Sequence, residues 1–85
     1  MLAKTLFRLL KKEGIEVTVL STSPVNGTKY EARNNNESLI FNVNDQDCCD
    51  YVRAFRYDDR FSFAENYDRG VYARTAKEAI AMLTA

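Results

Sequence analysis

A change of hydrophobic period at Gly14 constrains the fold of this chain more than any other feature. Over residues 2–13, apolar side chains recur at helical spacing, with lysine and arginine on the opposite side. After Gly14, apolar and polar residues alternate one by one, over residues 15–19, 29–33 and 38–43. The sequence therefore predicts one amphipathic helix, ended by Gly14 as its C-cap, and three half-buried strands after it.

Short turns make the neighbouring strands antiparallel. Asn26-Gly27 and the three asparagines at 34–36 are residue types that adopt positive φ angles in hairpin turns. The alternation also fixes which side chains face the core, because a slip by one residue would bury charged side chains. The expected inward-facing residues are Ile15, Val17, Val19, Tyr30, Leu39, Phe41 and Val43. Leu20 and Ile40 interrupt the polar face and predict a small exposed apolar spot.

About 12 residues after Asn44 have the spacing of a second helix. Asn44 or Asp45 can accept the hydrogen bond that caps its first turn. Aspartates near its start and arginines near its end suit the helix dipole. Its predicted core stripe, at positions i, i+3, i+4 and i+7, is Cys48, Tyr51, Val52 and Phe55.

A capping-box pair, Thr75 and Glu78, opens a last helix. Its predicted buried side is Ala76, Ala79, Ile80 and Leu83. Residues 57–74 fit an ordered loop, a short helix or a fourth strand at 71–74, and the sequence leaves these open. We therefore expect one α+β domain over residues 1–85, a three-stranded antiparallel sheet with helices on one face. Its expected order is α-β-β-β-α-(loop or short strand)-α.

Composition argues against several classes of function. The 12 basic and 12 acidic residues cancel, whereas a dedicated nucleic-acid binder is usually basic. Histidine is absent, and the isolated glycines form no phosphate-binding loop. Cys48 and Cys49 are adjacent, with aspartates nearby, but they lack the spacing of a zinc site and a partner that would activate a nucleophile. We expect no enzyme, no metal and no cofactor.

The chain also lacks the signals of membrane insertion and export. No stretch approaches the roughly 18 apolar residues that a bilayer span requires. Lysine and arginine interrupt the leucines of the N-terminal run, so it has no signal-peptide core. Two adjacent cysteines cannot staple distant segments, which suits a reducing compartment. We expect the cytoplasm of the host cell.

Residues 51–72 have the most unusual composition, with seven of the ten aromatic side chains of the chain. Arginines and carboxylates are interleaved with the rings, and tyrosine and arginine are enriched at protein interfaces. Some of these rings, Phe55 among them, can instead complete the core. A ring-rich stretch with weak periodicity favours a partner-binding loop over residues 56–72. Its predicted contact residues are Tyr57, Asp58, Asp59, Arg60, Tyr67 and Arg69.

The first helix offers an alternative contact surface. Its basic ridge consists of Lys4, Arg8, Lys11 and Lys12. Such a ridge can follow the phosphates of a nucleic acid, or it can be the solvated face of an amphipathic helix. Both interpretations stay open from the sequence alone.

Three features of residues 2–57 carry a resemblance to a known family. They are a short amphipathic helix running through a lysine-rich end into residues 16–19 (EVTV), an Asn-rich second hairpin, and a helix containing Val52 and Phe55. This layout resembles that of small phage-encoded anti-CRISPR inhibitors of the anti-Cas9 type. Those proteins carry a dense acidic face, whereas this chain is neutral, so the resemblance implies no site residues.

The resemblance implies a phage or mobile-element protein that binds a host or phage protein complex and blocks a host defence system. Together with the composition, it leads us to expect a non-catalytic protein-binding inhibitor or adaptor. The alternative is a small nucleic-acid-binding regulator that uses the basic first helix.

Overall fold

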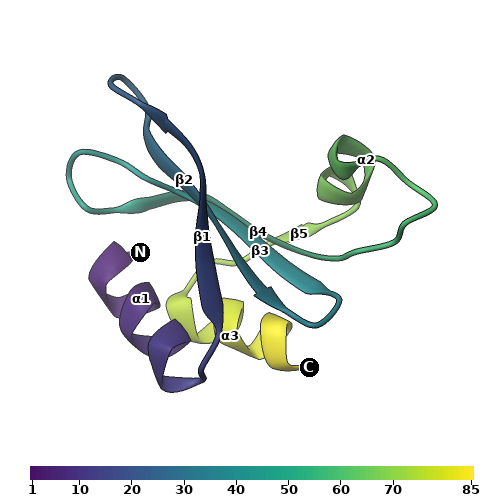
Figure 1. Ribbon diagram of the computed structural model, residues 1–85. Coiled ribbons are helices and arrows are strands. Elements are labelled where there is room, and N and C mark those ends of the chain that lie inside the picture. Colours follow the sequence, from purple (N-terminus) through teal and green to yellow (C-terminus); the bar gives the residue numbers. More distant parts are fainter.

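Five antiparallel strands form one sheet in which every strand pairs with the next one along the chain (Figure 1). The computed structural model describes residues 1–85. The elements are α1 (Ala3–Lys12), β1 (Glu16–Ser23), β2 (Gly27–Asn34), β3 (Glu37–Val43), β4 (Cys49–Arg56), α2 (Phe63–Asp68), β5 (Val71–Tyr72) and α3 (Ala76–Thr84). The α+β class is confirmed. The prediction of three strands is wrong, because β4 and β5 extend the sheet.

The first three strands form the two predicted hairpins. β1 pairs with β2, and β2 with β3, both antiparallel. At the β1–β2 turn Gly27 has a φ of +88°, and a Cβ there would collide with the carbonyl of Val43. At the β2–β3 turn Asn35 has a φ of 57°, which asparagine tolerates better than most residues. Both turns therefore use the residue types that the sequence indicated.

The predicted second helix is wrong, because its segment is a loop followed by β4. The side-chain oxygen of Asn44 accepts hydrogen bonds from the N–H groups of Gln46 and Cys48, at 2.9 and 3.1 Å. These bonds form a local turn in place of a helix cap. In β4 the pairing register with β3 shifts, and Tyr51 has a φ of 55°. The strand thus contains a bulge at Tyr51.

The predicted helical stripe does not form one buried face, because Val52 lies in the inner core cluster whereas Phe55 packs against α2. Inward-facing side chains of a regular strand lie two residues apart. The extra residue at Tyr51 places Cys49 and Val52, three residues apart, in the same core cluster. That spacing is also a helical one. Tyr51 itself is 71% exposed, and Cys49 is buried rather than its half-buried neighbour Cys48.

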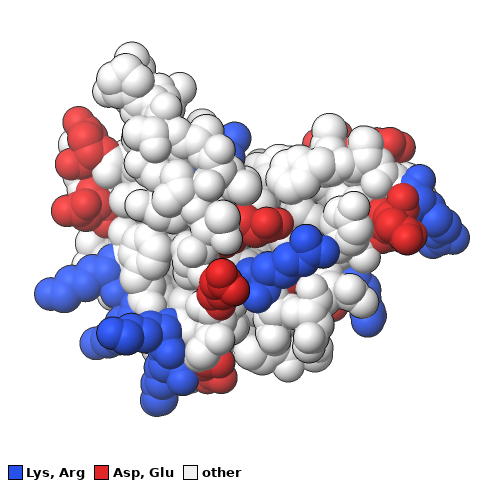
Figure 2. Space-filling view, viewed as in Figure 1, with Lys and Arg blue, Asp and Glu red and all other residues white.

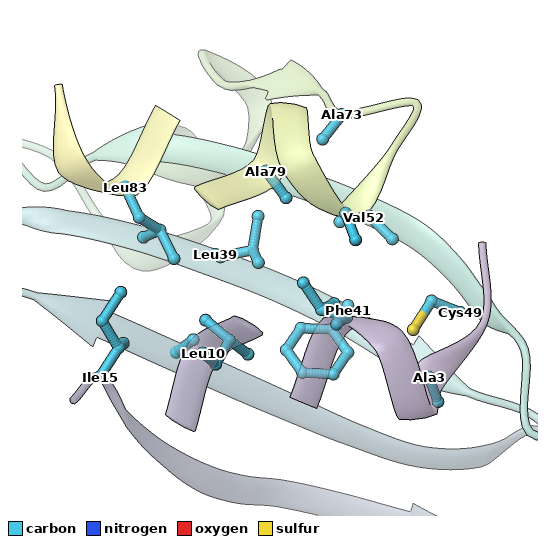
Figure 3. Packing of buried hydrophobic residues seen from close by; sticks show 13 residues of the cluster. Ala3, Leu10, Ile15, Leu39, Phe41, Cys49, Val52, Ala73, Ala79 and Leu83 are labelled. Carbon is cyan, nitrogen blue, oxygen red and sulfur yellow. The ribbon is translucent and has the colours of Figure 1, made fainter. Parts of the chain in front are cut away.

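The inner face of the sheet packs against α1 and α3. Figure 3 shows Leu10 from α1, Leu39 and Phe41 from β3, and Leu83 from α3 converging in one cluster. The predicted inward residues that lie in or against this cluster are Ile15, Val17, Tyr30, Leu39, Phe41 and Val43. Val19 is the exception, at 56% exposed. It lies beside the irregularity between Val19 and Ser21, in the edge strand β1.

The prediction that the helices share one face is also wrong, because α2 lies against the opposite face (Figure 1). The ring of Phe55 on β4 meets the rings of Phe63 and Tyr67 edge-on, at centroid distances of 5.9 and 6.4 Å. Ile40 was expected to be exposed with Leu20, but it is buried on this second face, while Leu20 is exposed. The short helix that covers Phe55 lies within the stretch that the sequence left open.

Side-chain caps set where α2 and α3 begin. The Thr75 hydroxyl accepts a hydrogen bond from the N–H of Glu78 at 3.1 Å, which is one half of the predicted capping box. At α2, Ser62 and Glu65 form a reciprocal capping box. No helix of the structure has the length and apolar character needed to cross a membrane.

Candidate functional site

The predicted contact segment, residues 56–72, forms one wall of an open hollow of about 620 Å³. The other wall comes from the end of β2 and the β2–β3 turn, because β3 pairs with both β2 and β4, and the turn reaches the residue that follows β4. There the N–H of Tyr57 donates to the carbonyl of Asn36 at 2.6 Å. The lining residues are Arg33, Asn36, Phe55, Arg56, Tyr57, Asp58, Asp59, Asn66 and Arg69. We call this site the arginine hollow.

Asn66, on α2, holds the loop of residues 57–62 in shape. Its side chain is buried, and the residue is only 1% exposed. The side-chain oxygen accepts a hydrogen bond from the N–H of Asp58 at 3.0 Å. The amide nitrogen donates to the carbonyls of Asp58, Phe61 and Ser62, at 2.9, 3.3 and 3.1 Å. One buried amide thus satisfies several backbone groups of the loop and gives the loop a defined shape.

Charged hydrogen bonds reinforce the same loop. Arg60 donates to both carboxylate oxygens of Asp58, with a shortest contact of 2.7 Å to Oδ2. The side-chain hydrogen bond from Arg60 lowers the pKa of Asp58 to about 2. Further along, the hydrogen bonds from Ser62 lower the pKa of Glu65 in the α2 capping box.

Two arginines that line the hollow have their guanidinium groups over aromatic rings. The Cζ of Arg33 lies 4.8 Å from the ring centre of Tyr57, and that of Arg69 lies 4.2 Å from the ring centre of Phe61. Arg56 has a loose ionic partner in Glu37, with a nitrogen–oxygen distance of 3.6 Å. A guanidinium group held beside a partly exposed ring can donate paired hydrogen bonds to a planar anion or stack on an aromatic group.

The structure brings four of the six predicted contact residues into this hollow. Tyr57, Asp58, Asp59 and Arg69 line it. Arg60 does not line it but holds Asp58. Tyr67 lies away from it, against Phe55, and burial raises the pKa of its hydroxyl.

Sequence reasoning missed Arg33 and Asn36, which reach the hollow from outside the predicted segment, and Asn66, which lies within it. Arg33 and Asn36 arrive through the pairing of β2 with β3 and of β3 with β4. No local sequence pattern reports that proximity. Asn66 lies in a helix of six residues, which is too short for a periodic pattern to show which of its side chains are buried.

A second groove, of about 520 Å³, lies on the outer face of the sheet near the β1–β2 turn. Tyr51 and Lys29 are among its lining residues. Its asparagines are already engaged, because Asn42 donates to the carbonyl of Asn26, and Asn44 donates to Asp50. This groove therefore offers fewer free polar groups than the arginine hollow.

The basic ridge of α1 is a separate surface. Lys4, Arg8, Lys11 and Lys12 are all exposed, and none lines the arginine hollow. Figure 2 shows blue side chains gathered over the region where Figure 1 places α1. The sheet separates this ridge from α2.

The two cysteines lie at the start of β4. Burial raises the pKa of the Cys49 thiol to about 11, and Cys48 is half-buried. No cluster of three or more histidine, cysteine, aspartate or glutamate side chains is arranged to hold a metal ion.

Comparison with known proteins adds no relative, since no family model, curated protein or solved structure matches the chain.

Proposed function

We propose that this protein is a non-catalytic binding module, an inhibitor or adaptor that engages another protein through the arginine hollow. The observation that carries the proposal is the buried amide of Asn66, which fixes a loop rich in rings and arginines on a rigid scaffold. A surface that is formed before the partner arrives loses less conformational entropy on binding. Tyrosine and arginine are also the side chains that most often dominate interface energetics.

We further propose that the partner belongs to a host or phage protein complex in the host cytoplasm, and that binding blocks a host defence system. The support is the layout resemblance over α1 and the first two hairpins. The part of that resemblance that relied on a helix containing Val52 and Phe55 is lost, because these residues belong to β4.

Replacement of Tyr57 tests the proposed contact surface. After affinity capture from host lysate and purification of the captured partner, Tyr57→Ala should weaken binding by about 1–3 kcal/mol in calorimetry. The thermal midpoint should change little, because the residue is 37% exposed.

Tyr72→Ala is the matched control. Tyr72 is also exposed and also lies under a guanidinium, with Arg53 at 4.6 Å, but it is outside the hollow. Equal losses of binding for the two variants, or none for Tyr57→Ala, would count against the hollow as the contact surface.

The alternative function, a nucleic-acid-binding regulator, is supported by the exposed ridge of α1. Under that alternative, retention on nucleic acid should fall about tenfold or more between low and physiological salt. At a given salt concentration, Lys4→Ala and Lys11→Ala should each reduce the retention on nucleic acid, while Tyr57→Ala should leave the retention unchanged.

A further inference from the structure

We propose that the arginine hollow receives an acidic side chain of the partner protein, anchored by the guanidinium groups of Arg33 and Arg69. The inference rests on the proposed function and specifies the chemistry of the partner. It depends on which charges in the hollow are already paired, on how the two guanidiniums are held, and on the acidic residues around them.

Arg33 and Arg69 have no carboxylate partner within the protein. The ion pairs of the structure are Arg56 with Glu37 and Arg60 with Asp58. The Nε of Arg33 donates to the carbonyl of Asn35 at 3.3 Å, which leaves its terminal nitrogens free. Both residues are exposed, so these donors are accessible to a ligand.

Aromatic rings hold both guanidinium groups in place. Arg33 stands over Tyr57, and Arg69 stands over Phe61. A guanidinium held over a ring keeps its N–H edges available, and those edges match a carboxylate in a bidentate geometry. Because the rings limit the rotation of these side chains, binding an anion requires less ordering of the arginines.

The surrounding charges favour an isolated carboxylate over a polyanion. With Asp58 neutralised by Arg60 and Glu37 by Arg56, Asp59 is the remaining carboxylate in the hollow, against two free guanidiniums. The net charge of the hollow is therefore positive, which favours the binding of one further carboxylate. A nucleic acid carries closely spaced phosphates. Some of these would lie against the unpaired carboxylate of Asp59.

Short peptides that alternate glutamate with glycine provide a direct probe. Titrated into the ¹⁵N-labelled protein, the glutamate peptide should shift the amide signals of residues 33–36 and 57–69. The peptide with glutamine in place of glutamate should not. Arg69→Glu should weaken binding of the glutamate peptide by about tenfold or more. Arg74→Glu is the matched control, since Arg74 is exposed and lies outside the hollow, and it should retain binding.

Several results would overturn the inference. The first two are an absence of shifts with the glutamate peptide and equal shifts with the glutamine peptide. The other two are binding of a lysine–glycine peptide in the hollow, and a single-stranded oligonucleotide that binds the same residues more tightly than the glutamate peptide does. If the purified partner loses affinity for Tyr57→Ala while the glutamate peptide does not bind, the proposed function stands and this inference alone fails. If the glutamate peptide binds at Arg33 and Arg69 but the partner is insensitive to Tyr57→Ala, the proposed function fails instead.

Discussion

At the scale of single residues, Asn66 has the largest influence on the shape of the site. Asn66→Ala removes the side-chain hydrogen bonds to the loop and leaves the part-buried N–H of Asp58 and carbonyl of Phe61 without another partner. The free energy of unfolding should fall by about 1–3 kcal/mol, measured by urea denaturation. Gln46→Ala, at an exposed amide, is the control and should change it by less than about 0.5 kcal/mol. Similar effects of the two substitutions would show that the loop does not depend on Asn66.

Asp58 gives the loop a specific dependence on pH. Its pKa is lowered from 3.8 to about 2, chiefly by the side-chain hydrogen bond from Arg60. A carboxyl group whose pKa is lower in the folded state stabilises the fold above its unfolded pKa, and this contribution is lost as the pH falls through the folded pKa. NMR titration of the Asp58 carboxyl should therefore give a midpoint near pH 2. In Arg60→Gln the midpoint should move up toward 3.8. A midpoint unaffected by this substitution would mean that Arg60 is not the cause.

The two cysteines should differ in reactivity although they are adjacent. Burial raises the pKa of Cys49 to about 11, so at neutral pH this thiol is protonated and shielded. Cys48 is more accessible. A thiol reagent followed by mass spectrometry should modify one site rapidly in the folded protein and the second only after unfolding. Cys48→Ser should abolish the rapid reaction, and Cys49→Ser should preserve it. Equal native rates at both sites would contradict the burial of Cys49.

At the scale of elements, two glycines with positive φ angles allow the cost of backbone strain to be compared with the cost of a steric collision. Gly14 ends α1 with a φ of +69° and open space at its Cβ position, whereas Gly27 has a φ of +88° and faces the Val43 carbonyl. Gly14→Ala should destabilise the protein by about 1–2 kcal/mol, from backbone strain alone. Gly27→Ala should cost about 3 kcal/mol or more, because β2 must also move away from β3. The midpoint of urea denaturation measures the loss of stability in each variant. Equal losses of stability in the two variants would contradict the close approach at Gly27.

The sequence predicted those elements whose period is regular and whose ends carry clear caps. α1, the two hairpins of β1–β3, and α3 with its Thr75 cap were predicted correctly. β4 was predicted as a helix because Val52 and Phe55, three residues apart, are both apolar, but in the structure they are buried on opposite faces of the sheet. α2 has six residues, too few for a periodic signal.

The candidate site was predictable only in its contiguous part. The stretch of residues 56–72 was recognisable by its rings and arginines, and the structure places Tyr57, Asp58, Asp59 and Arg69 in the hollow. Arg33 belongs to another strand and enters the site through sheet register. The residues around Arg33 do not indicate which residues of β3 and β4 lie opposite them, so its place in the site could not be predicted from the sequence.

At the scale of the whole molecule, the two faces of the sheet are covered unequally. The inner face carries a cluster of 13 buried residues beneath α1 and α3, whereas the outer face has the short helix α2 over Phe55. Amide hydrogen exchange should therefore be slowest in β2 and β3 and markedly faster in α2 and residues 57–62. Asn66→Ala should accelerate exchange in the second group and leave the first nearly unchanged. Uniform protection along the chain would mean that the two faces open together.

The strand order of the sheet has a consequence for synthesis on the ribosome. Each strand pairs with its predecessor, so β1 to β4 can assemble as they emerge, through contacts that are close in sequence. The helix α3, which completes the cover over Leu39 and Val52, emerges only after all five strands. A nascent sheet whose inner face is covered by α1 alone still exposes apolar surface, which chaperones bind and which can nucleate aggregation. The interval between the translation of β4 and that of α3 is therefore the stage at which this chain most depends on the quality-control machinery of the cell.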